Sequence, residues 1–166
     1  VRIYQNIDGT WTQVGSDIDG EAVGDESGLS VSLSADGSIV AIGAPGNDVG
    51  MGNIGIEVGH VRIYENVNGI WTQIGDDIDG EAEWDRSGYS VSLSFDGSVV
   101  AIGAPFSNGG TQYGPGSGNV RIYKNVSGNW TQIGFDLDGE AFGDKSGNSV
   151  SLSSEGSVVA IGAPYL

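Results

Sequence analysis

Residues 30–45 decide the fold, and they read Ser-Val-Ser-Leu-Ser-Ala-Asp-Gly-Ser-Ile-Val-Ala-Ile-Gly-Ala-Pro. Val31 and Leu33 alternate with serines, and this period of two is typical of a strand with two unlike faces. The Ala-Asp-Gly-Ser stretch favours a tight turn, and the apolar run after it predicts a strand buried on both faces. Pro45 ends that run, because proline cannot donate to a strand ladder. The stretch therefore predicts an antiparallel hairpin.

This hairpin belongs to a repeat that occurs three times. Its other copies stand at 90–105 and 149–164, and the segment Val-Arg-Ile-Tyr begins at Val1, Val61 and Val120. We divide the chain 1–166 into a single array with repeat copies 1–60, 61–119 and 120–166; the dissimilar linkers 46–60 and 106–119 are expected to be exposed loops. Each copy should contain four strands, in the first copy at about 1–5, 10–15, 28–34 and 38–44. No window predicts a helix, so we expect an all-β protein.

The charge balance excludes several classes of function. The chain has 166 residues, with 22 acidic and 6 basic side chains and a formal net charge of −16. Nucleic acid is excluded as a partner, since few cations are available to displace counterions from phosphates. No run approaches the roughly 20 apolar residues that span a bilayer, so we expect no membrane insertion. The lack of cysteine removes disulfides and thiol nucleophiles.

Four short antiparallel strands repeated about every 60 residues are typical of β-propeller blades. We expect three tandem repeats of such blades, with Val31 and Leu33 packed on the small-residue face of a neighbouring blade. A β-sandwich or a solenoid is the alternative. Closed propellers have at least about four blades, so this propeller should be incomplete or completed by oligomerisation.

A Ser-Gly-x-Ser-Val strand followed by a Val-Ala-Ile-Gly-Ala-Pro strand resembles the FG-GAP repeat. That family builds the seven-bladed propeller of integrin α subunits and many bacterial and algal surface proteins. Its Phe-Gly pair corresponds to Ser-Gly at 27–28, 87–88 and 146–147, and its Gly-Ala-Pro is intact at 43–45, 103–105 and 162–164. The family's calcium loop has no counterpart, because only the short turns 35–38, 95–98 and 154–157 join these strands.

The resemblance also implies the order of strands within a blade, with Ser-Val-Ser-Leu-Ser innermost and Trp-Thr-Gln-Ile-Gly outermost. Two complete blades then lie at about 28–75 and 88–134, between half blades at 1–15 and 147–166. Each half blade leaves an unpaired strand edge, which is a template for another chain. We expect either a fragment of a longer array or head-to-tail self-association into a ring or filament, with two chains supplying six blades.

These features suggest a non-catalytic module for adhesion or self-assembly through blade-to-blade strand pairing, in the extracellular space or at the cell surface. The alternative is a calcium-dependent carbohydrate-binding propeller, with a protein or glycan as ligand. An enzyme is not expected, because an active site is normally singular whereas the candidate carboxylates recur in every copy. We interpret His60, the only histidine, as a surface-loop residue.

The acidic loop after each Trp-Thr-Gln strand is the most site-like feature. Its carboxylates stand at relative positions 1, 3, 5 and 9, and such oxygen ligands suit a hard cation such as Ca²⁺. Alternatively, they cap turns and pair with the recurring Arg2, Arg62 and Arg121. The candidate metal ligands are Asp17, Asp19, Glu21, Asp25, Asp77, Asp79, Glu81, Asp85, Asp136, Asp138, Glu140 and Asp144.

Aromatic residues provide the remaining candidates. Trp84, Phe106 and Tyr113 interrupt the repeat and lie in loops, so we predict that they contact a ligand or partner. A second set recurs at one position of the outer strand, where tryptophan either seals a blade interface or stacks on a sugar. One residue in every copy favours sealing; these residues are Trp11, Trp71 and Trp130.

Overall fold

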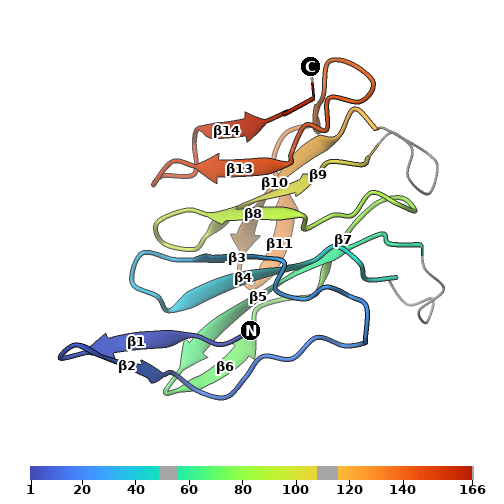
Figure 1. Cartoon of the computed structure of the whole chain (residues 1–166). Coiled ribbons are helices and arrows are strands. Elements are labelled where there is room, and N and C mark those ends of the chain that lie inside the picture. Colours follow the sequence, from blue (N-terminus) through green and yellow to red (C-terminus); the bar gives the residue numbers. More distant parts are fainter. Residues whose placement is uncertain (49–55, 108–115, 166) are drawn as a thin grey trace.

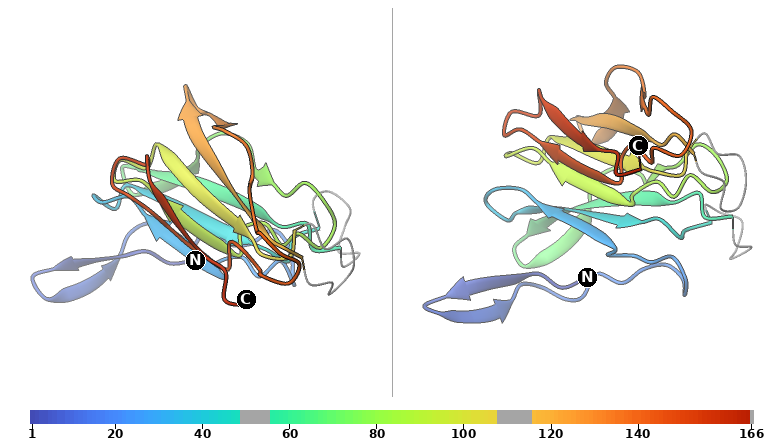
Figure 2. Two further views of the ribbon diagram at one scale, coloured as in Figure 1. Left: turned by 90° about the horizontal axis from the view of Figure 1, so that it is seen from above. Right: turned by 45° about the horizontal axis from the view of Figure 1, so that its top comes forward.

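The computed structural model describes residues 1–48, 56–107 and 116–165, which form strands, turns and loops (Figure 1). The all-β prediction is confirmed. Two large antiparallel sheets lie between two separate hairpins, and these four units follow one another in a stack (Figures 1 and 2). Among the described residues, no helix is long and apolar enough to cross a membrane.

The two hairpins and the two large sheets repeat one strand pattern. The N-terminal half-sheet consists of β1 (Tyr4–Ile7) and β2 (Thr10–Gln13). The first full sheet has the order β3-β4-β5-β6, with β7 beside β5; its strands are β3 (Ser30–Leu33), β4 (Ile39–Ala44), β5 (His60–Val67), β6 (Ile70–Gln73) and β7 (Ile78–Asp79). The second full sheet repeats this order with β8 (Ser90–Leu93), β9 (Val99–Ala104), β10 (Asn119–Val126), β11 (Asn129–Gln132) and β12 (Leu137–Asp138). The C-terminal half-sheet consists of β13 (Ser149–Leu152) and β14 (Val159–Gly162).

The Val-Arg-Ile-Tyr segment forms strands of different length in its three copies. β5 and β10 each have eight residues, and the first six of each pair with β4 and β9. β1 has only four residues and begins at Tyr4, although a strand was expected from Val1. The difference arises because, among the described residues, β1 pairs with β2 alone. The same motif therefore folds fully only where a neighbouring strand lies beside it.

The core lies between sheets, where the face of one sheet contacts the next. One cluster joins the two full sheets, and it contains Ala41, Val61, Ile63, Ile78, Leu93, Val100 and Ile102. Another joins the N-terminal half-sheet to the first full sheet, and it contains Ile3, Ile18, Val40 and Ile42. Burying each large aliphatic side chain contributes about 1.5–3 kcal/mol. The junctions between sheets therefore stabilise the fold.

The stack is open at both ends. The two half-sheets lie at opposite ends of it (Figure 1). Within the described part of the chain, β14 pairs only with β13, just as β1 pairs only with β2. Among the described residues, β1 and β14 therefore lack the second strand partner that β5 and β4 have in the first full sheet.

Candidate functional site at the junctions and open ends

Serine side chains connect the inner strands of neighbouring sheets. Ser30 Oγ donates to the carbonyl oxygen of Gly88, and Ser90 Oγ donates to that of Gly147, both at 2.7 Å. A second serine of each strand accepts a bond from the facing backbone at 3.0 Å, with Leu93 N–H donating to Ser32 Oγ and Leu152 N–H to Ser92 Oγ. Small size alone predicted packing at these positions, but the serines also fix how far each sheet is displaced along its neighbour.

Glycines let the inner strands approach each other at the same points. A Cβ atom on Gly43 would lie 2.0 Å from the carbonyl oxygen of Gly88, and one on Gly103 would lie 2.1 Å from that of Gly147. Contacts this short are not tolerated by any side chain. Gly162, the third member of the series, meets no atom of another copy.

Tryptophans close the outer rim of two junctions, the ones on either face of the first full sheet. Trp71 Nε1 donates to the carbonyl oxygen of Val14 at 2.8 Å, and Trp130 Nε1 donates to that of Ile74 at 2.9 Å. Both rings are half-buried between sheets, so they seal the junctions. Trp11, in the N-terminal half-sheet, is 67% exposed.

The two open ends expose residues whose counterparts are buried inside the stack. At the N-terminal end, Leu33 is 49% exposed, whereas Leu93 at the same position of the second copy is 7% exposed. At the C-terminal end, Val158 is 66% exposed, whereas Val99 is 6% exposed. Each end therefore presents one half of a junction.

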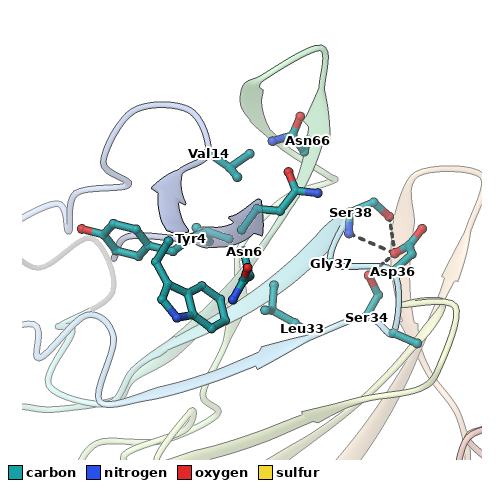
Figure 3. A pocket seen from close by; sticks show the side chains of 13 residues that line it. Tyr4, Asn6, Val14, Leu33, Ser34, Asp36, Gly37, Ser38 and Asn66 are labelled. Carbon is teal, nitrogen blue, oxygen red and sulfur yellow. Dashed lines mark hydrogen bonds between the residues drawn. The ribbon is translucent and has the colours of Figure 1, made fainter. Parts of the chain in front are cut away.

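A groove of about 480 Å³ lies at the N-terminal end, between the free edge of β1 and the turn after β3 (Figure 3). Tyr4 and Asn6 come from the half-sheet, and Leu33 and Gly37 come from the first full sheet. Asp36 shapes the turn, because its carboxylate accepts bonds from the backbone and hydroxyl of Ser38 and from the hydroxyl of Ser34. These hydrogen bonds, led by that from the Ser38 backbone, lower the pKa of Asp36 to about 2.

The acidic loops lie beside these junctions, and in the first two copies the first carboxylate of the loop pairs with arginine. Arg2 Nε lies 2.9 Å from Asp17, and Arg62 holds Asp77 through two nitrogens at 2.8 and 3.0 Å. Burial by itself raises the pKa of Asp77, but the hydrogen bonds from Arg62 and Gln73 outweigh this and lower it. Asp136 instead accepts bonds from Gln132 at 2.7 Å and Asn119 at 3.3 Å.

The glutamate of the loop reaches the arginine of the following copy. Glu21 pairs with Arg62, and Glu81 Oε1 lies 3.3 Å from Nη1 of Arg121. The side chains of these two arginines are 15% and 4% exposed, whereas Arg2, which no preceding copy approaches, is 61% exposed. Glu140, the equivalent glutamate of the third copy, is exposed, as Glu21 and Glu81 are.

The last carboxylate of the loop caps a turn. Asp25, Asp85 and Asp144 are buried, and each accepts a bond from the backbone N–H three residues earlier, at 3.0, 3.1 and 2.7 Å. Burial raises the pKa of Asp85. The second carboxylate of each loop is Asp19, Asp79 or Asp138, and all three are exposed. Asp79 and Asp138 also belong to the short strands β7 and β12.

One group of possible metal ligands emerges from the described residues; it combines two predicted ligands from different loops, Glu21 and Asp77, with His60, which was not predicted. Glu21, His60 and Asp77 place their ligand atoms within 4.8 Å of one another. Arg62 contacts both of these carboxylates and neutralises part of their charge. In the first two loops, the first, third and fourth carboxylates each have a different partner, and calcium binding stays a prediction.

The interpretation of His60 as a surface-loop residue is wrong. It begins β5, where its backbone pairs with Ala44 and Asp79, and its side chain is 4% exposed. Nδ1 lies 3.6 Å from Asp77. Burial, followed by repulsion from Arg62, lowers the pKa of His60 below its ordinary value of 6.5 despite the nearby carboxylates. Sequence reasoning missed this because the linker before His60 resembles no strand.

His60 should make the stability of the chain depend on pH near neutrality. Below its ordinary pKa of 6.5, the unfolded chain binds a proton that the folded chain rejects, so stability falls as the pH decreases toward the lowered folded pKa. The slope is at most about 1.4 kcal/mol per pH unit. Urea unfolding between about pH 5.5 and 7.5 should show this slope, and His60→Asn, which installs the residue found at Asn119, should remove it. If the unsubstituted chain and His60→Asn showed equal slopes, His60 would not be the source of the pH dependence.

The structure describes two of the three non-repeating aromatic residues, Trp84 and Phe106. Trp84 is half-buried, and its backbone N–H donates to the carbonyl oxygen of Ile56 at 2.7 Å. Phe106 lies against Lys145, whose Nζ is 4.5 Å from the ring centre. Tyr113 lies outside the described residues. Ligand contact by these residues stays a prediction.

Comparisons with known proteins show a likeness in fold only. No family model and no curated protein match the chain. A solved structure of a proposed 6-phosphogluconolactonase from Bacteroides fragilis is 14% identical, with a TM-score of 0.57 over 96% of this chain and 35% of that one. Another, from Bacteroides uniformis, is 14% identical, with a TM-score of 0.48 over 92% of this chain and 38% of that one. The chain thus spans little more than a third of these proteins.

The first of these structures corrects the expectation that the chain is not an enzyme. It is described as a proposed enzyme, so the likeness in fold contradicts that exclusion. The argument from repeated carboxylates was insufficient because a repeat fold can also carry unique side chains. His60 is one such side chain, since Asn119 takes its place in the next copy.

Proposed function

We propose that this chain is a β-propeller-type repeat module that associates head to tail through its two open ends. The observation that carries the proposal is the contrast between internal and terminal copies of the same contacts. Trp71 and Trp130 bond across junctions while Trp11 is exposed, and Val99 is buried while Val158 is exposed. The ends are therefore matching halves of a junction that the chain builds twice internally.

The unpaired strand edges add a second driving force. β1 and β14 each leave one row of backbone hydrogen-bonding groups without a strand partner in the described structure. Such edges pair readily with another chain unless they are covered or charged. Joining two half-sheets would pair both edges at once and bury the apolar end residues.

The two ends differ, so the contact would be head to tail. Such contacts give a ring if successive rotations close and a filament if they do not. Two chains would supply six four-stranded sheets. The resemblance to FG-GAP repeats supports adhesion at the cell surface or in the extracellular space as the setting of this assembly.

Light scattering tests this proposal. The chain, of 17.0 kDa, should show a mass that rises with concentration to two chains or more. Trp11→Ala should weaken association about tenfold, because it removes a large aromatic anchor from the contact. Ile70→Ala is the matched control, since Ile70 is 68% exposed but belongs to an interior sheet. A single-chain mass at every concentration would contradict the proposal, as would equal effects of the two substitutions.

A further inference from the structure

We infer that the C-terminal half-sheet of a second copy of this chain occupies the N-terminal groove, with its β14 paired antiparallel to β1 in one defined register. This inference rests on the proposed function and specifies its partner. The two half-sheets would then form one sheet with the order β13-β14-β1-β2. That is the order of both full sheets, β3-β4-β5-β6 and β8-β9-β10-β11.

The register follows from two internal examples. β4 pairs with β5 so that Gly43 lies opposite Val61 and Ile39 opposite Glu65. β9 pairs with β10 at the same offset, with Gly103 opposite Val120 and Val99 opposite Lys124. The equivalent residues at the open ends predict two intermolecular pairs, Gly162 opposite Val1 and Val158 opposite Gln5.

Val158 fits the groove because the equivalent residues of the first two copies, Ile39 and Val99, each pack against the turn glycine of the following copy. A Cβ atom on Gly97 would lie 2.7 Å from Ile39, and one on Gly156 would lie 2.8 Å from Val99. Gly37, which lines the groove, has nothing within 4 Å of that position. The missing side chain is the one that the exposed Val158 of a second copy would supply.

Backbone groups at the two rims of the groove agree with this placement. Asn66 N–H donates to Ser38 O and Asn125 N–H to Ser98 O, both at 2.8 Å, so Asn6 N–H should donate to Ser157 O of the second copy. On the opposite rim, Phe95 N–H donates to Ser154 O at 2.9 Å. Ser154 occupies the position of Phe95 in the third copy, so Ser154 N–H of the second copy should donate to Ala35 O of the chain whose groove it occupies.

Charge supports the same pairing. Glu21 and Glu81 each pair with the arginine of the following copy, Arg62 and Arg121. Continuing this series places Glu140 of the second copy beside Arg2 of the chain whose groove it occupies. Arg2 keeps its bond to Asp17, so one exposed guanidinium would be held between two carboxylates, as Arg62 is now.

Disulfide trapping tests the register, and the chain suits it because it has no cysteine of its own. The Asn66-to-Ser38 bond makes Ile39 and Glu65 a non-hydrogen-bonded pair, whose Cα atoms lie about 4.5 Å apart. That separation is within disulfide range. Gln5→Cys and Val158→Cys chains, mixed under mild oxidation, should therefore form a covalent dimer that thiol reduction releases.

Gln13→Cys is the matched control. Gln13 is exposed like Gln5 but lies in β2, one strand further from the predicted position of β14. Trapping with Gln5→Cys should exceed that with Gln13→Cys by about tenfold or more. Association in light scattering without preferential trapping at Gln5 would overturn this register and leave the proposed function standing. A single-chain mass throughout would overturn both.

Discussion

Replacing Gly103 with alanine is expected to lower the free energy of unfolding by about 3 kcal/mol, at the upper end of the usual effect of overpacking. The new Cβ would lie 2.1 Å from the carbonyl oxygen of Gly147 and 2.3 Å from Ser90 Oγ. The serine can rotate, but the carbonyl belongs to the backbone of the next copy. Relief therefore requires β9 to move away from the C-terminal half-sheet, which opens a junction. Urea unfolding of the single chain, followed by tryptophan fluorescence, measures the loss.

Gly162→Ala is the matched control for this substitution. Its Cβ would lie 2.3 Å from Ser149 Oγ, the same contact within a copy, but it meets no backbone of another copy. We expect the single chain to keep its stability within about 0.5 kcal/mol. Assembly should be blocked, because the Cβ would collide with Gly28 of a second copy. Equal destabilisation by both substitutions would show that the serine contact, and not the junction, limits residue size.

Trp130→Ala should lower the free energy of unfolding by about 3 kcal/mol, because it removes a large ring from the rim of the junction. Trp130→Phe should retain most of the packing and lose about 1 kcal/mol, since only the bond from Nε1 to Ile74 O disappears. Thermal and urea unfolding of dilute protein measure both effects. The difference between the two variants separates the hydrogen bond from the packing.

Trp11→Ala supplies the comparison within the same repeat position. Trp11 is exposed at the open end, so its loss should leave the stability of the single chain nearly unchanged. If Trp11→Ala and Trp130→Ala destabilise the single chain equally, tryptophan acts within its own hairpin and the sealing of junctions is refuted.

The strands and turns could be predicted because they depend on local pattern. Alternation at Val31 and Leu33 and the turn at 35–38 are visible within a few residues. The length of β1 was beyond such reasoning, since the motif at Val1 has the same first four residues as the motif at Val61. Only the presence of β4 beside β5 distinguishes them. The length of the strand that this motif forms therefore depends on whether another strand lies beside it.

The acidic loop shows the same limit. Its spacing identified four carboxylates per copy, but it could not separate their roles. The Asp25 carboxylate accepts a hydrogen bond from the backbone N–H of Ala22, and a contact over three residues can be predicted from the local sequence. Glu21 contacts Arg62 in the following copy, and that contact becomes visible only when the sheets are stacked. His60 was misplaced for the same reason, because β4 and β7 bury it from either side.

The inequality of the two ends would give the proposed assembly a direction, as in a polymer built from monomers with unlike reactive groups. A Gly162→Ala chain would have a blocked carboxyl-side face and an intact amino-side face. It would join a growing assembly once and accept no further chain. Small amounts of it would act as chain terminators, so the size distribution of a mixture would depend on the molar fraction of terminators.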